Sequence, residues 1–407
     1  MSANEKQKLN ESIQQTANEY SQAQGYANTK EAVGRMSRMM SSESPVTAAM
    51  GERMAGDFTQ SLLGLTLYQN FYNQYDLGAY SWINKFDDQI VNQGNQVQYT
   101  RQLITGSDQY VENMFNPTDL TFPKIDVVAY IKLYKTLGGN RQEDLADFTT
   151  NGCKGYKFKK PQTLIADQWI PYFKSGKLME FIGDVVSNMS KSYNLFKVNL
   201  FEEAITKIIS SAVAPSNQGQ TNESQLNTNQ VYKFNGNSAD MLNSFTKEIF
   251  PLITTMKFLT NKYNLRLNGN ATGLNNAKPE DILMFVNQKT YTRLNNGVLA
   301  NVFNNKLAEI EAIIPKENII CTGNKTNSVT GSSNAITMSS TPLIADNQVL
   351  IMTKDCLKHL TFLQYRPEEQ LYTTNLARQV TLHAWGSLGF IPWGQCVLYE
   401  NNNLGVA

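Results

Sequence analysis

The stretch SGKLMEFIGDVVSNMSKSYNLFKVNLFEEAITKIISSAVAP, residues 175–215, decides the fold. Its apolar residues recur at steps of three or four, which place side chains on one face of an α-helix. They are Leu178, Ile182, Val185, Met189, Tyr193, Phe196, Leu200, Ala204 and Ile208. Ser175 can cap the first turn, and Pro215 cannot continue a helix because it lacks an amide hydrogen. The stretch therefore predicts one long helix over residues 175–214.

The other face of this predicted helix is charged and nearly balanced in sign. It contains Lys177, Glu180, Asp184, Lys191, Lys197, Glu202 and Lys207. A membrane-spanning helix needs about 20 predominantly apolar residues, so this face excludes one. The apolar stripe drifts and does not hold the strict heptads of a coiled coil. We interpret the stretch as a spine helix that lies across a sheet.

Length and composition limit the possible classes of protein. A chain of 407 residues predicts two or three domains. Lys and Arg number 36 against 35 Asp and Glu, and this balance argues against a general nucleic-acid-binding protein. The four cysteines are far apart in the sequence and indicate no disulfide framework. With no secretory signal and no long apolar run, we expect synthesis in the cytoplasm and reduced thiols.

The first part of the chain is predicted to extend from a core that begins at residue 57. Residues 1–56 are polar, so we expect an arm that is mobile by itself. We expect contacts with groups outside the arm to hold it in place. A methionine-rich patch suits such a contact surface, because methionine fills irregular apolar gaps; it contains Met36, Met39, Met40, Met50 and Met54. Residues 57–85 are rich in Leu and aromatic residues, which is more typical of a core than of a ligand-stacking platform.

Residues 86–161 form a long polar excursion with two strand-like pieces, QVQYTRQLI and VVAYIKLY. Two alternating strands around a turn-rich middle predict a long β-hairpin extension. A basic cluster of Lys154, Lys157, Lys159 and Lys160 ends this excursion. We favour pairing of this cluster with acidic groups of a neighbouring subunit over contact with nucleic acid.

The second half of the chain predicts a separate α/β domain. A helix over residues 238–263, interrupted by Pro251, precedes an Asn/Gly-rich linker at 264–278. Strand patterns at 282–286, 318–321 and 348–353 then alternate with a helical pattern at 289–313. Residues 379–400 alternate like a pair of strands, which we expect to return to the first domain.

Candidate chemical sites are weak. Cys356, His359, His383 and Cys396 could in principle bind zinc, but the spacing of the second pair fits no usual module. Buried thiols and hydrogen-bonded imidazoles are the favoured interpretation. Ser387 lies one residue short of a nucleophile elbow, and residues 323–326 lack the glycines of a phosphate-binding loop. We predict no catalytic, cofactor or metal site, and no enzyme.

The order of these parts resembles the Hong Kong 97 type major capsid protein of tailed phages. DILMFVNQKTYTRLNNGVLANVF, residues 281–303, is similar to the strand-then-helix start of the axial domain in that family. Residues 347–375 and 379–400 are similar to the return from its axial to its peripheral domain. The similarity is greatest to the major head proteins of small short-tailed double-stranded DNA phages, including staphylococcal ones.

The resemblance implies an α+β fold of the Hong Kong 97-like type, divided as follows. An N-terminal arm spans residues 1–56, the start of the peripheral domain 57–85, the extended loop 86–161, the peripheral domain with its spine helix 162–269, the axial domain 270–380, and closing peripheral strands 381–407. It implies self-assembly, as pentamers and hexamers, into the icosahedral head shell around double-stranded DNA, with scaffolding and portal proteins and non-specifically bound DNA as partners.

The same resemblance implies a virion protein that is made in the host cytoplasm and has no membrane partner. Met36, Met39, Met40, Lys154, Lys157, Lys159 and Lys160 are then expected at contacts between subunits. An alternative is another virion component, such as a tail or receptor-binding protein, and an enzyme comes third. The Asn/Ser/Thr-rich composition fits the first alternative, but a long central helix and an α/β domain do not.

Overall fold

The protein is described by a computed structural model in which the chain forms two compact units. Unit 1 contains Met1–Gly78, Lys157–Lys197 and Leu363–Trp385, and unit 2 contains Ala79–Tyr156, Val198–Phe362 and Gly386–Ala407. The structure describes residues 3–70, 78–91, 98–102, 127–132, 153–213, 231–238, 244–260, 262–265, 275–292, 314–327, 337–362, 370–372, 377–390 and 394–405. Each unit is treated by itself below.

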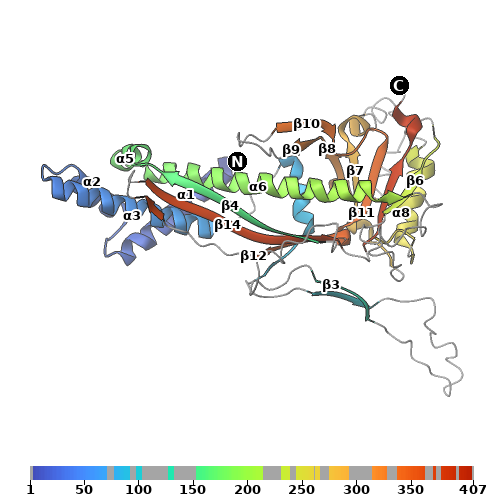
Figure 1. Ribbon diagram of the computed structural model, residues 1–407, viewed down its shortest axis with the longest axis horizontal. Helices are drawn as coiled ribbons and strands as arrows, with labels where there is room; N and C mark the ends of the chain where they lie inside the picture. Colours follow the sequence, from blue (N-terminus) through green and yellow to red (C-terminus); the bar gives the residue numbers. More distant parts are fainter. Residues whose placement is uncertain are drawn as a thin grey trace, which may run out of the picture. The chain divides into compact units, whose positions relative to one another are not determined.

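Unit 1 is mainly helical (Figure 1). Its helices are α1 (Ala3–Ala23), α2 (Thr29–Met40), α3 (Pro45–Asn70), α5 (Ala166–Lys174) and the first part of α6 (Leu178–Ser210). Asn28 caps α2, because its side-chain oxygen accepts from the Glu31 amide at 2.9 Å. At Gly51 of α3, an added Cβ would lie 2.6 Å from the Met40 nitrogen. A glycine there lets α2 and α3 approach each other closely.

The N-terminal region is helical, and the contacts outside the arm that were expected to hold it come from its own chain. Three helices occupy most of residues 3–70, and α3 runs through the predicted boundary at 56/57. Ala32, Met36 and Met40 of α2 are buried at steps of four residues, in one cluster with residues of α3. The prediction weighed mean polarity, but a helix needs only one apolar stripe to join a core. The region is therefore held by the chain's own core.

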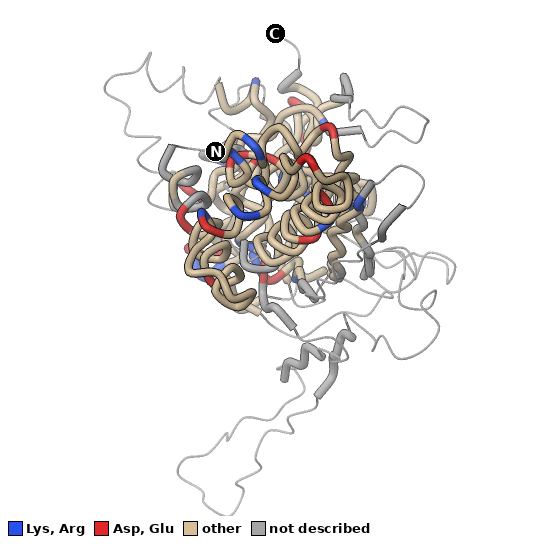
Figure 2. Tube along the Cα trace, turned by 90° about the vertical axis from the view of Figure 1, so that its left-hand side faces the viewer, with Lys and Arg blue, Asp and Glu red and all other residues tan. Residues whose placement is uncertain are grey.

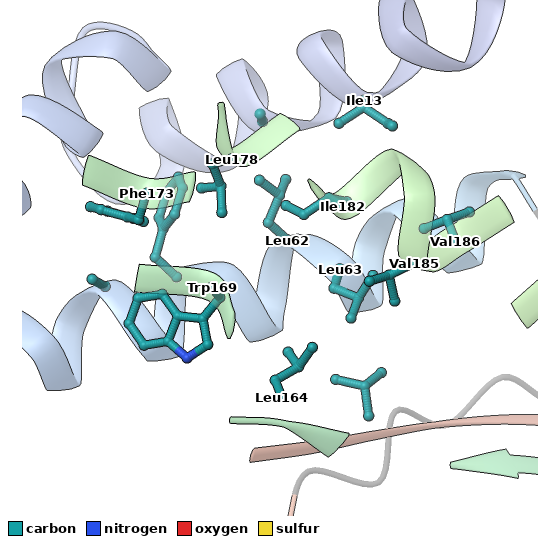
Figure 3. Close-up of a cluster of buried hydrophobic side chains, with 14 of the residues drawn as sticks. Ile13, Leu62, Leu63, Leu164, Trp169, Phe173, Leu178, Ile182, Val185 and Val186 are labelled. Carbon is teal, nitrogen blue, oxygen red and sulfur yellow. The ribbon is translucent and has the colours of Figure 1, made fainter. Parts of the chain in front are cut away.

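That core gathers buried side chains from five helices and from β4 (Cys153–Leu164) and β14 (Ala377–Phe390) (Figure 3). Its members include Ile13, Ala17, Phe58, Leu62, Leu63, Leu67, Leu164, Trp169, Phe173, Leu178, Ile182, Val185, Val186, Met189, Val380 and Leu382. Most of these side chains are less than 4% exposed. Each buried aliphatic or aromatic side chain contributes about 1.5–3 kcal/mol of transfer free energy.

The predicted long helix is present as α6, which has 33 residues. Of the nine apolar residues that predicted it, all but the half-buried Phe196 are buried. The predicted start was wrong, because Ser175 lies at the end of α5 instead. Gly176, with φ +74°, turns the chain between the two helices, and α6 begins at Leu178. A left-handed conformation is readily adopted by glycine alone, so the helix is divided there.

Unit 2 is built on a mixed six-stranded sheet. Its order is β5 (Ala212–Val213), β6 (Val231–Asn235), β15 (Cys396–Glu400), β11 (Gln348–Thr353), β7 (Ile282–Asn287) and β8 (Ile319–Thr322). Central β11 is antiparallel to both neighbours, whereas the β6–β15 and β7–β8 pairs are parallel. All six residues of β7 are buried. The strands predicted around 282–286, 318–321 and 348–353 are confirmed.

The remaining strands form smaller arrangements. A second sheet has the order β1 (Asp87–Val91), β12 (Leu357–Phe362), β14 and β13 (Gln370–Tyr372), with β4 pairing to β14. β9 (Asn324–Asn327) pairs with β10 (Thr337–Pro342). β2 (Gln98–Gln102) pairs antiparallel with β3 (Val127–Lys132), which confirms the predicted strand pair. Residues 92–97, 103–126 and 133–152 of the predicted hairpin lie outside the described residues.

Short helical turns connect these elements. The 3₁₀ turns are η1 (Gly78–Phe86), η6 (Pro279–Asp281), η7 (Lys316–Asn318), η8 (Lys354–Cys356) and η9 (Asn402–Gly405). A π-turn, η5 (Phe245–Ile249), leads into α8 (Phe250–Lys257). α8 buries Leu252, Ile253 and Met256 in one cluster with residues of the six-stranded sheet.

Two further predictions for the second half need correction. The helix expected over residues 238–263 ends at Lys257, and Pro251 lies in its first turn, where a missing amide hydrogen costs little. β14 and β15 do not pair with each other, and β15 lies between β11 and β6 instead. Alternation alone does not specify which strand is the neighbour. Only residues 289–292 of the predicted helix at 289–313 are described, and they are helical.

Substitution of Met189 by Asp tests the buried stripe of α6. Met189 is fully buried in the unit 1 core, so the substitution forces an unpaired carboxylate into apolar surroundings. We expect Met189→Asp to prevent folding or to lower the free energy of unfolding by about 3 kcal/mol or more. Leu195→Asp is the matched control on the same helix, because Leu195 is 42% exposed. Urea unfolding followed by circular dichroism measures both, and equal stability of the two variants contradicts the assignment.

Candidate functional site

In unit 1, one guanidinium group joins α3 to β14. Arg378, at the start of β14, is 7% exposed and forms an ion pair with the Asp57 carboxylate. Its Nη1 also donates to Gln60 Oε1 at 3.2 Å, and its Nη2 donates to the Arg53 carbonyl oxygen at 3.0 Å. Gln60 Nε2 donates in turn to the Gln379 carbonyl oxygen at 3.4 Å. Because the guanidinium is planar and always charged, these contacts fix the exposed and buried faces of α3.

Gly56 makes room for this guanidinium. A Cβ atom added at Gly56 would lie 2.5 Å from Arg378 Nε and 2.8 Å from its Nη2. Glycine inside a helix costs about 1 kcal/mol relative to alanine, so its presence needs a local reason. The close approach of the guanidinium provides that reason.

A double-mutant cycle tests the coupling of Gly56 and Arg378. In the wild-type chain, Gly56→Ala should lower the free energy of unfolding by about 1–2 kcal/mol, because the displaced guanidinium loses charged hydrogen bonds. In an Arg378→Ala background the same change should raise it by up to about 1 kcal/mol, since only helix propensity then acts. Urea unfolding of the four proteins gives the coupling. If Gly56→Ala changes the free energy of unfolding with the same sign in both backgrounds, the predicted coupling is contradicted.

In unit 2, a partly buried polar network joins β15 to the segment around η5. Tyr399 Oη donates to Glu248 Oε2 at 2.5 Å, and Glu248 Oε1 accepts from the Asn237 and Ser238 amides at 3.0 and 3.1 Å. Asn401 Nδ2 donates to the Ser238 carbonyl oxygen at 2.7 Å and to Tyr399 Oη at 3.0 Å. One carboxylate thus satisfies two backbone amides and one phenol.

These contacts shift the pKa values of the carboxylate and the phenol in opposite directions. Burial raises the pKa of Glu248, but the hydrogen bonds from Tyr399, Asn237 and Ser238 outweigh burial and lower it below its ordinary value. Burial, together with the hydrogen bond to Glu248, raises the pKa of Tyr399 to about 12. The network is therefore formed by an ionised Glu248 and a neutral Tyr399 at neutral pH.

Stability of unit 2 should depend on pH through Glu248. A carboxyl group with a lowered folded-state pKa stabilises the fold above its unfolded-state pKa, and this contribution disappears as pH falls through the folded-state pKa. Glu248→Gln should therefore cost about 1–3 kcal/mol at pH 7. The difference from wild type should shrink below about pH 4.5, the ordinary pKa. Chemical unfolding from pH 7 to pH 3 measures this difference, with the exposed Glu280→Gln as control. A difference that does not vary with pH contradicts the assignment.

Two of the four candidate zinc ligands lie together, because the Cys356 and Cys396 thiols interact, whereas His359 and His383 have other surroundings. Cys356 Sγ donates to the Gln395 carbonyl oxygen at 2.9 Å, and burial raises the pKa of Cys396. His359 Nδ1 lies 2.5 Å from Asp87 Oδ1, which joins β12 to β1. His383 belongs to unit 1, whereas the other three belong to unit 2. In the described ranges, no three His, Cys, Asp or Glu side chains are grouped as metal ligands would be. The geometry of these residues fits buried thiols and a hydrogen-bonded imidazole.

The family of the chain follows from residues 154–399, which include all of α6 and the strands from β5 to all but the last residue of β15. These residues, more than half of the 407, match the family model described as Phi29-like phage major capsid protein. The chain belongs to this family. The capsid protein is therefore a virion protein that forms the phage head shell, as the resemblance predicted. No curated protein matches the chain at a significant level.

Several solved phage capsids are similar to the capsid protein in structure. The capsid of Staphylococcus phage Andhra is 12% identical, with a TM-score of 0.46, and the alignment covers 81% of this chain and 85% of that one. The capsid of cyanophage P-SCSP1u is 11% identical, with a TM-score of 0.42 and coverages of 82% and 94%. The mature capsid of bacteriophage PhiM1 is 12% identical, with a TM-score of 0.40 and coverages of 82% and 91%. The assignment above rests on the family match.

The residues predicted to contact other subunits differ in their surroundings. Met36 and Met40 of the capsid protein are buried in its own unit 1 core, whereas Met39 is partly exposed. Lys154, Lys157, Lys159 and Lys160 lie on β4. The Lys160 side chain is half-buried, and the other three side chains lie outside the described residues. A role of these seven residues between subunits stays a prediction.

Apart from Met50 and Met54 of the methionine-rich patch, the exposed apolar side chains were missed by the sequence analysis. Four exposed apolar side chains lie on α3, and Phe258 and Leu259, which directly follow α8, are 67% and 60% exposed. The spacing of Val46, Met50 and Met54, four residues apart, was the available signal. It was overlooked because the region was expected to be a mobile arm. A shell protein needs surface that is apolar before assembly, so these residues are candidate contacts.

The distribution of charge and the lengths of the apolar helices further characterise the capsid protein. Acidic and basic residues are interspersed along the described trace (Figure 2). The formal net charge is +1. Within the ranges that the structure describes, no helix is both long and apolar enough to cross a bilayer.

Proposed function

We propose that the capsid protein builds an icosahedral head shell from pentamers and hexamers, enclosing the double-stranded DNA of a tailed phage. The observation on which this rests is the family match over residues 154–399. We further propose that its subunits have the Hong Kong 97-like fold. Three features support that fold. The 33-residue α6 corresponds to its spine helix, the β2–β3 strand pair to its extended loop, and the six-stranded sheet to its axial domain.

The proposed mechanism is repeated weak contact between identical subunits. An exposed ion pair contributes only about 0.2–1 kcal/mol, and an apolar contact of one side chain contributes somewhat more. Closed symmetry repeats each contact at every equivalent position, so small contributions add up to a stable shell. In this proposal the extended loop and the N-terminal helices supply contacts to neighbouring copies. Scaffolding and portal proteins, non-specific contact with packaged DNA and synthesis in the host cytoplasm are proposed on family grounds.

Electron microscopy of the purified protein tests the proposed function. We expect shells, capsomers or curved sheets at sufficient protein concentration, because identical surfaces are available on every subunit. Co-expression with the scaffolding protein of the same phage should increase the fraction of closed shells. Fibres of fixed length, or monodisperse monomers under all of these conditions, contradict the proposal.

The basic cluster of β4 gives a more local test. Lys157 and Lys159 lie on the same face of the strand, because side chains alternate with a period of two. We expect Lys157→Glu with Lys159→Glu to leave the melting temperature of the monomer nearly unchanged and to suppress particle formation. Ordinary assembly of the double variant means that the cluster is only solvated. Salt-sensitive DNA binding by the isolated monomer, lost in the variant, favours contact with nucleic acid instead.

A further inference from the structure

A groove of about 840 Å³ lies on unit 1, between α1, α2 and the turn from α5 to α6. We name it the α2 groove. Its volume is within the range of about 300–1,000 Å³ that is usual for ligand sites. Its lining includes four apolar side chains: Phe173 and Leu178 are buried, and Val33 and Met179 are half-buried. These side chains suit a partner that inserts an apolar group of its own.

The charged side chains around the α2 groove are mostly basic. Lys30, Arg38 and Lys174 line it and are exposed, whereas Glu31 is the acidic residue in its described lining. Glu31 Oε2 accepts from the Ala27 amide at 2.9 Å, so this carboxylate is engaged at the start of α2. Among the described residues, none forms an ion pair with any of the three cations. The groove therefore carries an excess of positive charge beside its apolar lining.

Gly34 of α2 keeps the groove open at its side. A Cβ atom added at Gly34 would have nothing within 4 Å, whereas Gly51 and Gly56 of α3 each have a close neighbour that requires glycine. Glycine inside a helix is destabilising relative to alanine, so its presence needs a reason. In the described part of the chain, no contact supplies one for Gly34. A group that approaches α2 closely from another molecule would supply it.

Hydrogen bonds hold the walls of the α2 groove in place. Thr29, in the first turn of α2, donates from Oγ1 to Asn18 Oδ1 of α1 at 2.8 Å. The Thr29 amide donates to the same oxygen at 3.2 Å. On the other wall, Gly176 with φ +74° sets the turn between α5 and α6. The groove exists in the single subunit, so a partner that binds there would lose little free energy to reorganisation.

One segment of the chain matches the α2 groove in charge and in apolar content. It contains Glu143, Asp144 and Asp147, and no other window of five residues in the sequence holds three acidic residues. Leu145 and Phe148 lie among and directly after them. The segment belongs to residues 133–152, which lie outside the described part of the chain. In the groove, its three carboxylates would face three cations, and its apolar side chains would meet the apolar lining.

We propose that residues 143–148 of one copy of this chain bind in the α2 groove of a second copy. The proposal rests on the proposed function, since a shell requires contacts between copies, and it names the two surfaces of one such contact. Opposite charges set the register of the contact, and the apolar side chains exclude water from it. Nucleic acid is the less favoured occupant, because its phosphates would pair with the cations but leave the apolar lining uncovered.

A matched pair of charge reversals on α2 tests this contact. Lys30 and Arg35 are both exposed, but only Lys30 lines the groove, and the two lie about 140° apart around the helix. A carboxylate is favourable in the first turn, so we expect Lys30→Glu, like Arg35→Glu, to melt near the wild-type temperature. At equal protein concentration, Lys30→Glu should reduce the yield of particles about tenfold or more, because every equivalent contact is weakened. Arg35→Glu should assemble like the wild type.

Substitution of Gly34 fills the α2 groove from within. Because leucine favours a helix more than glycine does, the Gly34→Leu monomer should melt at a higher temperature than the wild type. The yield of particles should nevertheless fall, since the added side chain occupies the space of the partner segment. Thermal melting followed by circular dichroism and particle yield are measured on the same sample. A variant that melts higher and assembles like the wild type overturns the contact.

Carbodiimide cross-linking of wild-type particles gives a measurement that needs no substitution. The reagent joins a carboxylate to a lysine amine in contact with it, through an amide bond. Particles assembled from isotope-labelled and unlabelled chains are treated and digested, and mass spectrometry identifies the joined peptides. The proposal expects links from Lys30 or Lys174 to the acidic residues of 143–147, with one labelled and one unlabelled partner. Links within single chains only, or no link between these residues, overturn the contact even if Lys30→Glu fails to fold.

The outcomes separate this contact from the proposed function. If the wild type forms no particles or oligomers at any concentration, the proposed function fails, and the contact fails with it. If the wild type forms shells and Lys30→Glu forms them equally well, only the contact is overturned. Salt-dependent DNA binding by the monomer that Lys30→Glu abolishes and Arg35→Glu preserves assigns the groove to nucleic acid and also overturns the contact. Reduced assembly of Lys30→Glu together with links between chains supports both.

Discussion

The contact of Arg378 with α3 determines how the helical unit is organised. A buried guanidinium must have its donors satisfied, and here the partners come from about two turns of α3: Asp57, Gln60 and the Arg53 carbonyl. Because the group is planar, it sets the rotation of α3 about its axis as well as its distance from β14. That rotation puts Phe58 and Leu62 into the core and leaves Met50 and Met54 in solvent. The packing of α2 on Gly51 then follows.

The two units obtain their stability in different ways. Unit 1 depends on apolar side chains from helices far apart in the sequence, and its buried charged side chains include Arg378 and Lys197. Unit 2 depends on a sheet whose strand β7 is buried throughout, and on the polar network around Glu248. β4, α6 and β14 each contribute residues to both units. Since many of these contacts join residues over a hundred positions apart, folding requires long loops to close before either core is complete.

The sequence predicted those elements whose signal is local. α6 has a continuous apolar stripe of helical period, and β7 and β11 are short apolar runs between turn residues, so all three could be recognised. Other features depend on distant partners. The ion pair of Arg378 with Asp57 joins residues 321 positions apart, and no pattern in the sequence indicates it. The place of β15 between β6 and β11 is likewise a matter of topology, since alternation does not name a neighbour.

The integration of α1–α3 into unit 1 has a consequence for how such a chain can be altered. Ile13, Ala17 and Met36 are less than 4% exposed and share one cluster with Trp169 and Leu178. Proteases that cut only extended, solvated segments should therefore spare this region in the native subunit. A foreign peptide displayed on the particle is better fused ahead of Ala3 than exchanged for the first helices, because their loss would leave a hollow beside α5 and α6.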